Sequence, residues 1–90
     1  MNKVIITVVG VDAVGIIASV SNYLAKNKVN ILDISQTVVG GFFNMMMVAD
    51  GSASEKKFDK LCADLSRVGQ TLGVEIRCQK SEIFEKMHRV

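Results

Sequence analysis

The residues best placed for chemistry lie in one short segment, VVGVDAVGI at positions 8–16. Gly10, Asp12 and Gly15 stand there between a β-branched run and a helical pattern, so the segment joins a strand to the start of a helix. The first N–H groups of a helix have no internal partner and carry partial positive charge, which attracts anions. Because glycine has no side chain, a small ligand can approach this backbone closely.

Each of these residues also has a purely structural explanation. Asp12 either offers its carboxylate to the ammonium group of a ligand or caps the helix, a role worth roughly 0.5–2 kcal/mol without any ligand. In the structural explanation, Gly10 simply forms a turn, and Gly15 simply lets the helix pack closely on the sheet. The segment suits a zwitterionic ligand, and on the loop alone both interpretations stay open.

The other reactive side chains form no catalytic or metal-binding set. His88 is the single histidine and lies near the chain end, which leaves a histidine-based triad without a centre. Cys62 and Cys78 have no neighbouring Cys or His, so their spacing fits neither a zinc site nor a redox pair. We therefore expect a non-catalytic protein that uses no metal and no cofactor.

The composition narrows the class of protein further. Ninety residues make one domain, residues 1–90, and 49% of them are hydrophobic. The 11 basic and 9 acidic residues are scattered, whereas nucleic-acid binding needs clustered positive charge. No apolar stretch reaches the about 18 residues of a membrane span, and no secretion signal is evident. We expect a cytoplasmic protein with reduced cysteines and with neither a nucleic-acid nor a membrane partner.

The hydrophobic periodicity predicts six elements in the order β-α-β-β-α-β. Gly40 and Gly41 form a turn signal between two strands, Ser52 and Glu55 match a capping box, and Gly73 is a helix terminator. This order is typical of an α+β ferredoxin-like sandwich, in which two helices cover one face of a four-stranded antiparallel sheet. The expected elements are a strand at 3–9, a helix at 14–26, strands at 29–39 and 42–50, a helix from 52 to 72, a strand at 74–78 and a short C-terminal helix from Ser81.

Apolar residues at helical spacing define the buried stripes of the two helices. The strands, however, are apolar on both faces, and two helices cover only one face. We expect a homo-oligomer, most simply a dimer, in which a second copy covers the other face, with the C-terminal segment as a partial cover. Alternatively, the five methionines fill the core. The predicted stripes are Ile16, Ile17, Val20, Tyr23 and Leu24 in the first helix, and Phe58, Leu61, Cys62, Leu65, Val68 and Leu72 in the second.

At this point the residues resemble a known family. The pattern G-x-D-x-x-G-I at 10–16, followed by VNILDISQ at 29–36 and F-x-M at 43–45, is similar to the ACT domain, a small ligand-binding regulatory module associated with amino-acid metabolism. The resemblance covers nearly the whole chain. It is strongest to single-domain ACT proteins, and extends to the N-terminal domain of formyltetrahydrofolate deformylase and to the glycine-cleavage repressors.

The resemblance implies a function as well as a βαββαβ fold. ACT domains pair through their sheets and bind amino-acid effectors between the first loop of one copy and the second strand of a neighbouring copy. Val14 stands where many such members carry proline, and Asp12 where they carry asparagine. The implied ligand-binding positions are Gly10, Val11, Asp12, Val14, Gly15, Ile16, Asn30 and Ile31.

The implied activity is non-catalytic regulation, in which an amino acid or similar small polar metabolite binds at a homodimer interface. The alternative is a structural module that oligomerises or docks onto another protein without a small-molecule ligand. Asp33, in the segment NILDIS, fits either a charge at the rim of the subunit contact or a partner for a basic residue.

Overall fold

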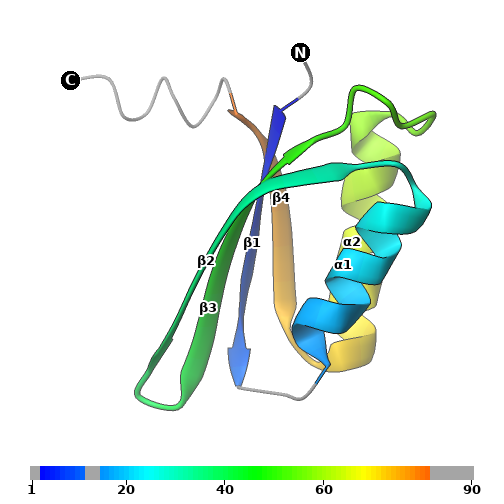
Figure 1. Ribbon diagram of the computed structural model, residues 1–90. Coiled ribbons are helices and arrows are strands. Elements are labelled where there is room, and N and C mark those ends of the chain that lie inside the picture. Colours follow the sequence, from blue (N-terminus) through cyan, green and yellow to red (C-terminus); the bar gives the residue numbers. More distant parts are fainter. Residues whose placement is uncertain (1–2, 12–14, 82–90) are drawn as a thin grey trace.

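The computed structural model describes residues 3–11 and 15–81 and confirms the predicted order of elements. Four antiparallel strands form one sheet in the order β2-β3-β1-β4, and both helices lie on one side of it (Figure 1). The fold is therefore α+β and ferredoxin-like, and the expected C-terminal helix lies outside the described residues. The elements are β1 (Lys3–Val11), α1 (Ile16–Lys26), β2 (Asn30–Val39), β3 (Phe42–Asp50), α2 (Phe58–Leu72) and β4 (Glu75–Lys80).

The core lies between the sheet and the helices. Alternate residues of β1 and β3 point toward the helices, as the two-residue period of a strand requires. The buried faces of α1 and α2 follow the predicted stripes, with one correction. Ile17 is 38% exposed, because α1 scarcely contacts β2 and no layer covers this side of the helix. The buried core residues are Val4, Ile6, Val8, Ile16, Val20, Leu24, Val29, Phe43, Met45, Met47, Ala49, Leu61, Leu65, Val74 and Ile76.

The predicted capping box at Ser52 and Glu55 is wrong. The Ser52 N–H and hydroxyl both donate to Oδ1 of Asp50, at 2.9 and 2.6 Å, which folds the chain into a turn directly after β3. Helix α2 begins only at Phe58, with Lys57 at the N-cap position and no side-chain cap. The end of α2 follows the prediction, since Gly73 adopts the left-handed conformation at φ 75°.

One carboxylate joins the two helices to the loop before α2. Asp64 is 8% exposed, and its Oδ2 accepts hydrogen bonds from the Tyr23 hydroxyl at 2.6 Å and from Lys56 Nζ at 2.7 Å. Lys60 Nζ lies 3.0 Å from Oδ1, and the Arg67 guanidinium lies 3.6 Å from it. These donors, Lys56 first and then Tyr23 and Lys60, hold the pKa of Asp64 well below its ordinary value. The contact fixes α1 against α2.

The face of the sheet away from the helices is not wholly apolar, and its exposure varies along the strands, since Ile5 on this face is buried. The register places Val39, Phe42 and Val11 side by side in one row at the end near the β2–β3 turn, and all three are exposed. The next row is mixed, with Thr37, Asn44 and Val9. The expectation of a second apolar face is thus confirmed for this end of the sheet.

Candidate functional site

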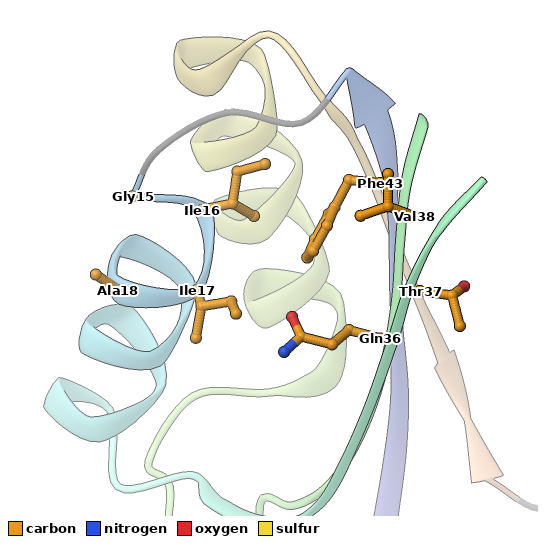
Figure 2. A pocket seen from close by; sticks show the side chains of 8 residues that line it. All are labelled: Gly15, Ile16, Ile17, Ala18, Gln36, Thr37, Val38 and Phe43. Atoms are coloured by element: carbon orange, nitrogen blue, oxygen red, sulfur yellow. The ribbon is translucent and has the colours of Figure 1, made fainter. Parts of the chain in front are cut away.

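A cavity of about 520 Å³ opens between the start of α1 and the second half of β2 (Figure 2). Its volume lies within the roughly 300–1,000 Å³ that small-molecule sites commonly occupy. Residues from α1, β2 and β3 form its walls, so three elements distant in sequence meet there. The described lining residues are Gly15, Ile16, Ile17, Ala18, Gln36, Thr37, Val38 and Phe43.

The α1 wall of the cavity is the first turn of that helix. Gly15 occupies the N-cap position at φ 91°, where a side chain would strain the backbone, and no side chain of the described residues caps the helix there. The first bond of the helix runs from the Ser19 N–H to the Gly15 carbonyl. The N–H groups that precede Ser19 in this turn therefore have no partner inside the helix, as expected from the sequence. Asp12 and Val14 lie outside the described residues.

Gly10 has a packing role that the sequence left open. A Cβ on this residue would lie 2.6 Å from Cγ1 and 2.9 Å from Cβ of Val74, which is too close for any real contact. The glycine therefore lets β1 approach Val74, which lies between α2 and β4. Gly10 and its neighbour Val11 do not belong to the described lining of the cavity.

Asn30 and Ile31 lie at the far end of the sheet from the first loop. Asn30 pairs with Asp50, whereas the opposite end of β2 pairs with Phe42, which also lies opposite Val11. Ten residues of strand separate these ends by about 30 Å. The structure of one chain therefore unites Gly15 and Ile16 with the cavity but not Asn30 and Ile31. Only a second copy can bring the two predicted groups together.

The sequence did not identify Gln36, Val38 and Phe43 as site residues. A β-bulge between Ile31 and Asp33 reverses the alternation along β2, so the even-numbered residues that follow it face the helices. Figure 2 shows Gln36 and Val38 on the helix side and Thr37 on the other. Once the bulge is known, a polar residue within an apolar strand face is the pattern that singles out Gln36.

The cysteines and the possible metal ligands of the described residues form no cluster. The Cys62 thiol donates to the Cys78 carbonyl at 3.6 Å, and burial raises the pKa of both thiols, which disfavours the nucleophilic thiolate form. Residues 3–11 and 15–81 contain no group of three metal-ligating side chains. Over the same ranges, neither helix has the length and apolar character that a membrane span requires.

Asp33 lies on the open face, opposite Val48, and is exposed. It forms no ion pair with another described residue. The described part of this chain therefore offers no basic residue that pairs with Asp33. The interpretation of Asp33 as a charge at the rim of the subunit contact stays a prediction.

The comparisons identify the family. The ACT domain model matches residues 2–79, and the chain is 56% identical over 90 residues to a UPF0237 protein of Bifidobacterium longum, with both chains covered completely. An ACT domain protein from Streptococcus pneumoniae has the same fold, with a TM-score of 0.83 and 46% identity over 93% of this chain and 94% of that one. This chain belongs to the ACT domain family and, within it, to the UPF0237 group.

Two larger proteins contain a similar domain, as the sequence resemblance suggested. A formyltetrahydrofolate deformylase from Pseudomonas syringae superimposes with a TM-score of 0.82 at 23% identity, over 90% of this chain and 28% of that chain. A glycine cleavage system transcriptional repressor superimposes with a TM-score of 0.77 at 25% identity, over 89% and 46% of the two chains. The deformylase likeness shows a shared fold alone.

Proposed function

We propose that this protein is a non-catalytic regulatory module that binds an amino acid or a similar small polar metabolite at a homodimer interface. ACT domains are in general regulatory modules that bind small molecules. The observation that carries the proposal for this chain is the cavity at the start of α1, beside the uncovered edge strand β2.

The walls of the cavity suit an amino acid. The N–H groups of the first turn of α1, which have no partner inside the helix, favour a carboxylate, because they are donors at the positive end of the helix dipole. Gln36 adds a side-chain amide that can donate or accept. The buried ring of Phe43 and the exposed side chains of Ile17 and Val38 offer apolar surface to the remainder of the ligand.

The edge of β2 supports a dimer. Nine of its ten residues are exposed, and Asp33 is its only charged residue, so the strand lacks the lysines and prolines that usually protect an edge from pairing. Antiparallel pairing of two β2 edges would continue the sheet from one copy into the other. It would bring Asn30 of the second copy to the end of β2 that borders the cavity. The predicted cross-chain site follows from this arrangement.

Ligand binding would then act by shifting a population. A molecule that touches the α1 wall of one copy and Asn30 of the other binds the dimer better than the monomer, and so favours the dimer in proportion to that difference. No bond in the ligand is made or broken. The regulated output is the assembly state of the module.

Calorimetry with a panel of amino acids, together with sedimentation of the protein with and without ligand, tests the proposal. We expect binding by at least one amino acid and a tighter dimer in its presence. Asn30→Ala should weaken that binding although Asn30 lies far from the cavity of its own chain, and Gln79→Ala, on the opposite edge strand, is the matched control. Absence of heat with every amino acid, at a concentration where the dimer persists, would refute the ligand.

A second function is favoured by the exposed row of Val39, Phe42 and Val11 and by the packing role of Gly10. These features need no ligand and fit a module that only oligomerises or docks onto another protein. The two functions separate in the same experiment, because a stable dimer without ligand heat would support the second alone.

A further inference from the structure

We propose that the cavity selects amino acids with an uncharged side chain, and that Gln36 is the residue that sets this selectivity. The inference rests on the proposed function, because it concerns the ligand of the same cavity. Three observations support it: which side chains line the cavity, how exposed each of them is, and the lack of ionisable side chains in the described lining.

The floor and rim of the cavity are apolar. Phe43 is 6% exposed and forms the floor from β3, while Val38, at 58% exposed, forms the rim on β2. The exposure rises steeply between these directly paired neighbours, because the helices cover β3 and leave β2 open. Ile17 faces them from α1 across the cavity (Figure 2). A ligand side chain placed there would remove apolar surface from water on both sides.

Gln36 is the one polar side chain of the described lining that points toward the helices. Thr37, the other polar residue, pairs with Asn44 and points to the opposite face of the sheet, as Figure 2 shows. The Gln36 amide has no side-chain hydrogen-bond partner among the described residues. Its two donors and its acceptor are therefore available to a ligand.

The described lining contains no ionisable side chain. A charged group that enters the cavity would gain no countercharge from these described residues, whereas a neutral group needs none. The Gln36 amide can satisfy a neutral polar group but cannot neutralise an ion. Leucine, methionine and glutamine fit these walls, and aspartate and lysine do not.

Calorimetry at pH 7 with these five amino acids tests the inference. We expect the wild-type protein to bind leucine or methionine at least about tenfold more tightly than aspartate or lysine. Gln36→Leu should leave leucine binding nearly unchanged and weaken glutamine binding by about 5- to 10-fold, since one hydrogen bond is lost. Gln36→Glu should raise the affinity for lysine relative to leucine by about tenfold or more.

Gln79→Leu and Gln79→Glu are the matched controls, because they make the same two changes on β4, the opposite edge strand, away from the cavity. They should leave every affinity within about twofold of the wild type. Circular dichroism of each variant establishes that these exposed substitutions leave the fold intact.

Three outcomes are distinguishable. If the wild type binds none of the five amino acids, nor any other amino acid of the panel, the proposed function fails and the inference fails with it. If it binds aspartate or lysine as tightly as leucine, or if Gln36→Glu changes lysine binding no more than Gln79→Glu does, the inference is overturned while the proposed function stands. Selectivity for neutral side chains that the Gln36 variants alter and the Gln79 variants leave unchanged supports both.

Discussion

Substitution of Gly10 by alanine tests whether this glycine serves packing or ligand binding. The added Cβ would meet Val74 Cγ1 at 2.6 Å, its Cβ at 2.9 Å and its Cα at 3.1 Å. The Val74 side chain is stiff about χ1, and its Cα belongs to the backbone. These atoms of Val74 therefore cannot move away easily. Overpacking of this kind costs typically about 1–3 kcal/mol. The loss of unfolded-state entropy offsets about 0.4–1 kcal/mol of it.

The net destabilisation should therefore be about 1–2 kcal/mol, which lowers the melting temperature of a domain of this size by at least about 4 °C. Urea and thermal unfolding without any ligand measure it. In the double variant with Val74→Ala, the shortest contact disappears, while those to Cβ and Cα remain. The cost of Gly10→Ala should then fall by roughly 1 kcal/mol compared with its cost in the wild type.

Two results would refute this reasoning. Gly10→Ala that is as stable as the wild type would show that the strand accommodates the methyl group. Strict additivity of the two substitutions would show that Val74 is not the neighbour responsible. If instead the variant folds with wild-type stability but loses ligand binding, Gly10 is a ligand residue, as the family resemblance implied.

Further predictions concern the helices. Gly69→Ala should destabilise the protein by about 2–3 kcal/mol, at the upper end of the overpacking range, because its Cβ would lie 2.8 Å from the Val74 backbone carbonyl; chemical unfolding decides this. Gly15→Ala should cost about 1–2 kcal/mol through its positive φ, since no described atom lies within 4 Å of the added Cβ, and Gly15→Asn should cost less, as thermal unfolding of the pair will show. The depressed pKa of Asp64 stabilises the fold above its ordinary value of 3.8, and the stabilisation is lost as pH falls toward the lower folded-state value. The stability difference between wild type and Asp64→Asn should therefore shrink between pH 5 and pH 2, and a constant difference would contradict the role of the carboxylate.

The order of elements and most of the core could be predicted because period and composition agree along nearly the whole chain. Leu61 and Leu65, for instance, are spaced for one helix face and are buried. The start of α2 was mispredicted, since the Ser52 hydroxyl bonds backward to Asp50 instead of forward into a helix. A capping pattern read from spacing alone cannot reveal which partner the hydroxyl selects.

The site was harder to predict than the fold. Gly15 and Ile16 were expected from the loop pattern, and both line the cavity. Gln36 was missed because a single extra residue in β2 reverses which side chains face the helices, and the sequence around the bulge carries no glycine to mark it. Asn30 was implied by resemblance only, and one chain cannot place it near the cavity.

The position of β2 at the margin of the sheet also determines where the molecule opens first. Its amides are held from one side only, by β3, and the helices barely touch it. In an isolated copy these amides should exchange with deuterated solvent through small local fluctuations, well before those of β1. If two copies associate along this margin, slow exchange will spread into this one strand, so its protection directly reports the fraction assembled.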